Sequence, residues 1–135
     1  MHLGGCQCGE IRYQISGAPV DLYVCHCAEC RRQSASAFGI SVIVKKADFK
    51  FTKGNPSVWR RPAHNSGHLD CYFCPTCGVR LCHQPPDPAP MLSVKGGSLD
   101  QPPDMTTAHH IWTGSKLDGI CIPDGVDQHV ADPEP

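Results

Sequence analysis

The sequence predicts a mainly β protein built from antiparallel sheets. Thirteen glycines and thirteen prolines interrupt the 135-residue chain, so no stretch keeps a 3.6-residue apolar period long enough for a long helix. Short alternating or β-branched segments recur instead, as expected for strands. Ten cysteines are present, and seven of them stand in the close spacing typical of metal ligands.

The strand predictions rest on side-chain alternation and β-branching. Residues 11–15 alternate between apolar and polar side chains, residues 38–44 are rich in Val and Ile, and residues 69–73 run directly into a cysteine pair. Many turns separate these segments, which favours antiparallel pairing. Five further short strands are predicted at residues 22–25, 49–52, 58–61, 91–94 and 108–112.

One short helix is predicted over residues 28–34, directly after a cysteine triplet. Its residues are compatible with a helix, and Glu29 lies in the positive first turn. The proline-rich segments 85–90 and 101–104 are predicted loops, because proline cannot continue a strand ladder. With no repeat and no second core, we expect a single domain over residues 1–128 and a flexible tail at 129–135.

The charge and the distribution of apolar residues argue against several classes of protein. The net charge is −1 and the pI about 6.7, which argues against the broad positive field of a nucleic-acid-binding protein. No run approaches the roughly 20 apolar residues of a membrane span. The N-terminus lacks the pattern of a secretory signal, so we expect a cytoplasmic protein in which cysteines bind metal rather than form disulfides.

The cysteines form two sets of unequal size. Cys6 and Cys8 near the N-terminus, with Cys74 and Cys77 in the middle of the chain, supply four thiolates and predict a closed tetrahedral zinc site. Glycine follows each pair, which allows the backbone to curl so that amide groups point at the sulfurs.

The second set is the triplet Cys25, Cys27 and Cys30. Three ligands leave either an open catalytic position or a site completed by a further side chain, and the spacing does not decide between them. Cys71, Cys82 and Cys121 are more simply explained as packing residues, and His26 as a group beside the site or on the surface. The candidates for a fourth ligand are Cys71, Cys82, His83, His26 and a distant histidine.

The cysteine motifs resemble those of the glutathione-dependent formaldehyde-activating enzyme family. The resemblance runs through GCQCG at residues 5–9, CHCAECR at 25–31, YFCPTCG at 72–78, HIWT at 110–113 and IPDG at 122–125. It implies curved sheets of the Mss4-like type with two zinc ions per chain. One zinc is then structural, on Cys6, Cys8, Cys74 and Cys77, and the other is catalytic, on Cys25, Cys27 and Cys30.

The resemblance also implies a reaction and a partner. The family joins formaldehyde reversibly to glutathione, so the expected activity is that of a carbon–sulfur lyase acting on S-hydroxymethylglutathione or a related thiol adduct. Guanidinium groups would orient the carboxylates of glutathione, although any one of them can equally be a solvated surface group. The candidates are Arg31, Arg32, Arg60 and Arg61, and His64 and His68 are candidate proton carriers.

A second interpretation is a zinc-stabilised Mss4-like module that binds a protein partner and has no catalytic activity. It requires an exposed apolar patch or strand edge, for which residues 40–44 and the loop 85–90 are the candidates. A homodimer is compatible with either interpretation. Zinc knuckles that bind nucleic acid are disfavoured by the balanced charge.

Overall fold

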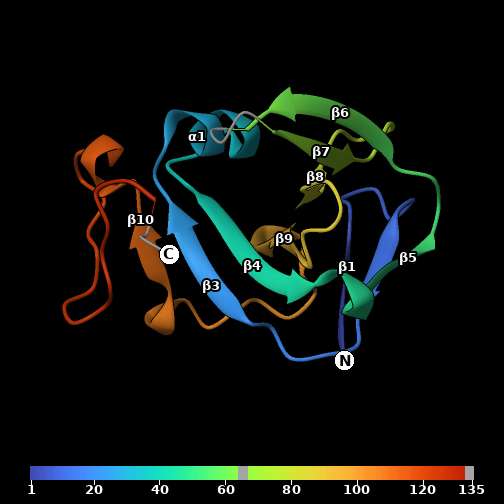
Figure 1. The fold of residues 1–135 in the computed structure, drawn as a ribbon, viewed down its shortest axis with the longest axis horizontal. Helices are drawn as coiled ribbons and strands as arrows, with labels where there is room; N and C mark the ends of the chain where they lie inside the picture. The colour runs from blue at the N-terminus through green and yellow to red at the C-terminus, as the bar shows by residue number, and fades with distance from the viewer. Residues whose placement is uncertain (64–66, 133–135) are drawn as a thin grey trace.

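The computed structural model describes residues 1–63 and 67–132 and contains ten strands, one α-helix and four short 3-10 turns in that part of the chain (Figure 1). His64 lies outside the described residues. The strands are β1 (His2–Gly5), β2 (Arg12–Ile15), β3 (Asp21–Cys25), β4 (Gly39–Lys45), β5 (Phe49–Lys53), β6 (Ser57–Pro62), β7 (His68–Phe73), β8 (Arg80–Gln84), β9 (Met91–Lys95) and β10 (His109–Ile111). The helix is α1 (Ala28–Ser34), and the 3-10 turns are η1 (Lys46–Asp48), η2 (Gly96–Ser98), η3 (Met105–Thr107) and η4 (Thr113–Ser115).

The strands form two sheets. A three-stranded sheet has the order β1-β2-β5, and a seven-stranded sheet has the order β10-β3-β4-β9-β8-β7-β6. All pairs are antiparallel except that of β10 with β3. Figure 1 shows the large sheet curving so that β6 and β7 lie across from β3 and β4, with α1 at one end of the curve. The prediction of a mainly β fold with one helix after the triplet is confirmed, and β1 and β8 are strands that the sequence did not indicate.

One face of the large sheet is apolar and carries the core. In the register of the sheet, Val42 stands opposite both Leu22 and Val94, and Cys82 stands opposite Val94. This row packs against the small sheet, where Tyr13 and Ile15 of β2, and Ile11 just before that strand, are at most 1% exposed. Burial of such side chains stabilises each by about 1.5–3 kcal/mol. The core therefore lies between the two sheets, and the other face of β3, β4 and β9 remains for a site.

The chain after residue 127 runs beside β10. His129 N donates to His110 O at 2.9 Å, and Thr113 N donates to His129 O at 3.1 Å. The indole of Trp112 donates to Asp132 at 2.7 Å. These bonds place Trp112 and Asp132 at the end of β10. None of the described helices is long and apolar enough to cross a membrane.

Candidate metal centres

Two matching loops build the four-cysteine site. Cys6 N donates to Ile11 O at 3.1 Å, and Cys74 N donates to Val79 O at 3.0 Å. In each loop the glycine after the second cysteine, Gly9 or Gly78, has a φ of 82°, a left-handed conformation that glycine adopts without steric cost. The first loop joins β1 to β2 and the second joins β7 to β8. The two loops therefore bring four thiols together from distant parts of the chain.

The sulfur geometry of this site fits zinc. The four Sγ atoms lie within 4.8 Å of one another, with Cys6 to Cys8 at 3.6 Å and Cys8 to Cys74 at 3.7 Å. A regular tetrahedron with Zn–S bonds of about 2.3 Å has sulfur–sulfur distances of about 3.8 Å. Backbone amides also point at the sulfurs, and the amide of Val79 is the main cause that lowers the pKa of Cys77 to about 6.

The triplet forms a second sulfur cluster at the junction of β3 and α1. Cys25 ends β3, Cys27 is the N-cap residue of α1, and Cys30 lies in its first turn, with Cys30 N donating to Cys27 Sγ at 3.3 Å. The three Sγ atoms lie within 4.8 Å of one another. Hydrogen bonds from Cys25 and Cys30 lower the pKa of the Cys27 thiol, whereas the same contacts raise the pKa of Cys25. The cluster therefore releases its first proton readily, as a metal site requires.

No fourth Cys, His, Asp or Glu of the described chain joins this triplet. Cys71 and Cys82 are fully buried packing residues, whereas Cys121 is exposed. His83 is bonded to the guanidinium of Arg80 at 2.8 Å. The donor set of the described residues is thus three sulfurs beside a space, which suits a metal that keeps one position for a reactant.

His26 lies inside the protein behind the triplet rather than at the surface. It is 0% exposed, and its Nε2 is 2.9 Å from His110 Nδ1. The two rings are stacked with centroids 5.2 Å apart, and the ring of Phe38 meets His26 edge-on. Burial lowers the pKa of both histidines. The pair therefore packs as neutral rings that hold the segment between Cys25 and Cys27 against β10.

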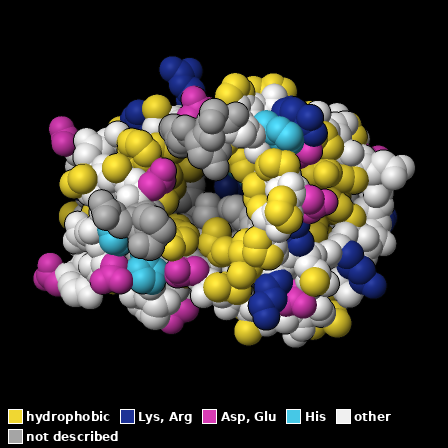
Figure 2. Space-filling view, viewed as in Figure 1, with side chains coloured by type: hydrophobic (Ala, Val, Ile, Leu, Met, Phe, Trp, Pro, Cys, Tyr) yellow, Lys and Arg dark blue, Asp and Glu magenta, His cyan; other side chains and the backbone are white. Residues whose placement is uncertain are grey.

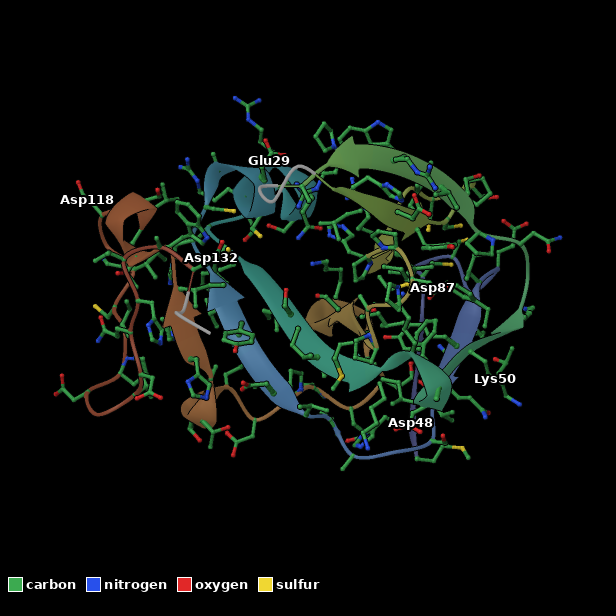
Figure 3. All side chains as sticks on the ribbon, viewed as in Figure 1. Glu29, Asp48, Lys50, Asp87, Asp118 and Asp132 are labelled. Carbon is green, nitrogen blue, oxygen red and sulfur yellow. The ribbon has the colours of Figure 1, made fainter. Side chains whose placement is uncertain are left out.

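A cavity of about 410 Å³ opens beside the triplet. All three triplet cysteines line it, together with side chains from β4, β6, β8 and β9. Figure 2 shows that the molecule is hollowed near the centre of one face. Asp132, labelled in Figure 3, and Trp112 lie at the edge of the cavity and are hydrogen bonded to each other. The polar or titratable side chains that line the cavity, apart from the cysteines, are Tyr23, Ser41, Arg61, His83, Ser93, Lys95, Trp112 and Asp132.

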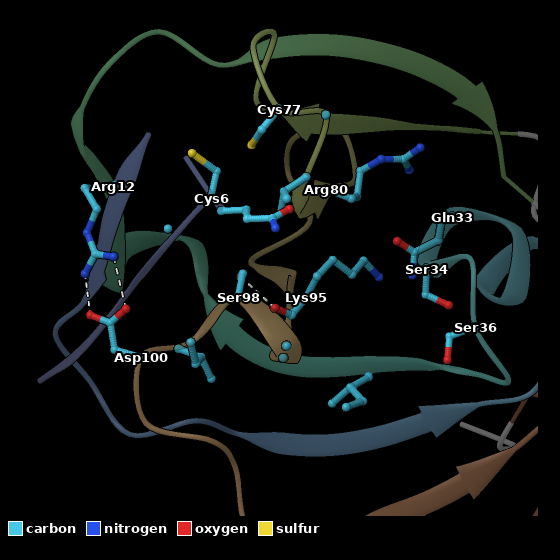
Figure 4. Close-up of a pocket in the computed structure, with 18 of the residues that line it drawn as sticks. Cys6, Arg12, Gln33, Ser34, Ser36, Cys77, Arg80, Lys95, Ser98 and Asp100 are labelled. Carbon is cyan, nitrogen blue, oxygen red and sulfur yellow. Dashed lines mark hydrogen bonds and ion pairs between the residues drawn. The ribbon is translucent and has the colours of Figure 1, made fainter. Parts of the chain in front are cut away.

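A second cavity, of about 740 Å³, adjoins the first and is shown in Figure 4. Arg12 and Asp100 form an ion pair on its wall. Lys95 lines both cavities. In Figure 4 the Lys95 side chain extends from β9 toward Gln33 and Ser34 of α1.

The four candidate arginines lie in three different places. Arg61 lines the triplet cavity. Arg60, its neighbour on β6, forms an ion pair with Asp70 at 2.7 Å. Arg31 and Arg32 line a separate surface depression with Leu117. His68, the described candidate proton carrier, lines another depression beside the loop 85–90. The structure therefore brings Arg61 alone of these candidates into the triplet cavity.

Sequence reasoning missed the polar residues on the floor of the cavity. Ser41, Ser93 and Lys95 are interleaved in β4 and β9 with the core residues Val42, Val44, Leu92 and Val94. Because side chains alternate across a strand, the pattern Ser-Val-Lys at the end of β9 places Ser93 and Lys95 on one face. The sequence did contain one signal for these residues, because Lys95 is a charged residue at an alternating position of a buried strand.

The comparison with known families agrees with the cysteine motifs. A family model described as glutathione-dependent formaldehyde-activating enzyme matches residues 1–115. The chain belongs to this family. Both sulfur clusters of this formaldehyde-activating family member lie within the matched residues. The crystal structure of a Rhodobacter sphaeroides protein has a TM-score of 0.57 to the chain at 19% identity, covering 94% of this chain and 98% of that one. At this identity the likeness shows the shared fold alone.

Membership of the formaldehyde-activating family confirms the resemblance inferred from the sequence. It supports a formaldehyde-activating or related function with a glutathione-type thiol. The two sulfur clusters can hold metal ions, consistent with zinc.

Proposed function

We propose that this chain is a zinc-dependent carbon–sulfur lyase that makes and breaks the S-hydroxymethyl adduct of glutathione or of a related small thiol. One observation carries the proposal: four sulfurs close around one site, whereas three sulfurs form the other beside an open cavity. A closed set is typical of structural zinc, and a set of three protein ligands is typical of catalytic zinc.

The residues of the two sites then have different tasks. Cys6, Cys8, Cys74 and Cys77 would hold the structural ion, and Cys25, Cys27 and Cys30 the active-site ion, giving two per chain. When bound to the triplet, zinc supplies Lewis acidity and a position at which a thiol is captured as thiolate.

The side chains of the cavity would orient the rest of the substrate. Arg61 is the candidate for a carboxylate of glutathione, since it lines the cavity and has no ion pair among the described residues. Arg60 is already paired with Asp70. The Trp112 indole and the apolar side chains Ile43, Leu69 and Ile111 would exclude water from the reacting group.

The alternative, a protein-binding module without activity, is weaker. The loop 85–90 remains as one of its two candidate surfaces. The other, the apolar run 40–44, forms most of β4, which pairs with β3 on one side and β9 on the other. It therefore offers no free strand edge to a partner.

The proposed function is tested by metal content and turnover together. The purified protein should contain two zinc ions per chain and should accelerate both formation and decay of the adduct of ¹³C-formaldehyde with glutathione, followed by NMR. Adduct rates equal to those of buffer, at full zinc content, would refute the enzyme and leave the binding module.

A further inference from the structure

Lys95 is a buried lysine on the floor of the triplet cavity. Its side chain is held between two serines, with Nζ 3.3 Å from Ser41 Oγ and 3.3 Å from Ser93 Oγ. The residue is only 8% exposed, and no ion pair joins it to a carboxylate in the described part of the chain. A buried ammonium without a carboxylate is costly. The cost of burying Lys95 in this way indicates that the residue has a role in the cavity.

The register of β4 places this ammonium close to the triplet. Gly39 and Ser41 lie two residues apart on one face of β4, a separation of about 7 Å. The thiol of Cys30 packs over Gly39, since a Cβ built there would lie 3.5 Å from Cys30 Sγ. Ser41 stands opposite Lys95 in the sheet. The Cys30 sulfur and the Lys95 side chain are thus placed by neighbouring positions on one face of β4, and both residues line one cavity.

This spacing selects which part of a substrate reaches Lys95. A thiolate captured at the triplet would share the cavity with the Lys95 side chain, so the group that meets Lys95 would be one attached close to that sulfur. The oxygen of an S–CH₂–O unit satisfies this condition. The carboxylates of glutathione stand several bonds further from its sulfur and fit the cavity wall at Arg61 better.

We propose that Lys95 is a catalytic residue that donates to the aldehyde oxygen, an assignment that rests on the proposed lyase function. In the forward direction the thiolate sulfur forms a bond to the carbonyl carbon, and the π electrons move to the oxygen. The Lys95 ammonium gives that oxygen a proton, producing the hydroxymethyl thioether, and the amine regains a proton from water. Ser41 and Ser93 are positioning residues, because they fix Nζ toward the cavity.

The kinetic test separates binding from chemistry. Lys95→Met should lower kcat for adduct formation and decay by about 10²–10³-fold, while the Kd of glutathione measured by calorimetry changes less than threefold. Lys95→Arg keeps the charge but has no readily transferred proton, so it should also be slow. Lys45→Met, an exposed position at the end of β4, is the matched control. A kcat of Lys95→Met within threefold of wild type, at two zinc ions per chain, would overturn the assignment.

A binding test does not depend on turnover. Mercaptoacetate carries an oxyanion one carbon from its sulfur, and ethanethiol is a similar thiol without one. The wild-type protein should bind mercaptoacetate at least tenfold more tightly, Lys95→Met should lose this preference, and Lys95→Arg should keep part of it. Equal affinities in wild type would refute the oxygen contact. Preferential binding without turnover on any aldehyde would refute the lyase function and leave the contact standing.

Discussion

The Sγ atoms of Cys8 and Cys74 lie 3.7 Å apart, although 66 residues separate them in the chain. Cys6 and Cys74 are also members of the core cluster between the two sheets. A metal ion bound at this point would therefore tie the loop after β1 to the loop after β7 at the edge of the core. Structural zinc in small peptides contributes roughly 10–16 kcal/mol, whereas a whole domain is stable by about 5–15 kcal/mol.

We therefore expect Cys74→Ser to lose the structural zinc and to unfold at room temperature. The expected result is loss of the near-UV circular dichroism signal together with less than one zinc ion per chain by mass spectrometry. Cys121→Ser, which changes an exposed cysteine outside both clusters, should keep both ions and the wild-type melting temperature. A folded Cys74→Ser protein with two zinc ions would contradict the assignment of this site.

Loss of a triplet cysteine should have the opposite pattern. Cys27→Ala removes the N-cap acceptor of a seven-residue helix and one sulfur of three, but it leaves the core between the sheets unchanged. We expect zinc to fall from two ions to one, adduct turnover to vanish, and the melting temperature to drop by only a few degrees, because an N-cap contributes about 1 kcal/mol. Retained turnover would show that the triplet is not the reaction centre.

The cysteine clusters were predictable because their ligands are local pairs and a local triplet. Gly9 and Gly78 signalled the matching loops, and the alternation of residues 11–15 signalled a strand of the core. Two strands gave weaker signals. β1 ends in two glycines, and β8 carries Cys82 and His83 where an apolar pattern would be expected.

The cavity was not predictable in the same way, because it depends on how far the large sheet curves. In the sequence, Arg60 and Arg61 are neighbours that cannot be told apart. Because side chains alternate across β6, Arg60 pairs with Asp70, whereas Arg61 lines the cavity. The parallel pairing of β10 with β3, which buries His26 against His110, joins segments 84 residues apart. No local pattern carries that information.

Gly39 should be needed for the triplet site but not for the fold. A Cβ built there would lie 2.9 Å from Gln33 Nε2 and 3.1 Å from Cys30 Cβ, so an alanine would displace the end of the Gln33 side chain and shift Cys30 by a few tenths of an ångström. We expect Gly39→Ala to lose the triplet zinc to a chelator roughly 10–100-fold faster, the range seen when ligand positioning is disturbed. Gly97→Ala, at a site with nothing within 4 Å of a new Cβ, is the control. Equal loss rates in the two variants would contradict this prediction.

Substitutions at Arg61 and Arg60 form a matched test of which arginine binds the carboxylate of the substrate. Removing a charged hydrogen bond costs about 1.5–3 kcal/mol, so Arg61→Met should raise the KM for glutathione roughly 10–150-fold with little change in kcat. The same variant should act normally on 2-mercaptoethanol, which has no carboxylate. Arg60→Met breaks only the pair with Asp70 and should leave both KM values unchanged. An equal loss with both thiols would mean that Arg61 does not bind the carboxylate.

His83 should make the protein sensitive to mild acid. It is 5% exposed, and Arg80 donates to its Nε2 at 2.8 Å, which leaves the ring proton on Nδ1. Burial lowers the pKa of His83 to about 2, assisted by the positive charges of Lys95, Arg80 and Arg61, the charged groups that act on it. In the unfolded chain the pKa of histidine is about 6.5.

The sign of the effect follows from where the proton binds. Below pH 6.5 the unfolded chain takes up a proton at residue 83 that the folded protein refuses, so stability is complete above pH 6.5 and falls as the pH decreases. Relative to His83→Gln, the free energy of unfolding of wild type should fall by roughly 1 kcal/mol between pH 6.5 and pH 5.5. Urea unfolding in excess zinc measures this difference, and zinc release in acid affects both proteins alike. The control is His2→Gln, which changes an exposed histidine of β1. Its free energy of unfolding should depend on pH in the same way as that of wild type. If His83→Gln also kept the wild-type pH dependence, His83 would have to bind a proton in the folded protein.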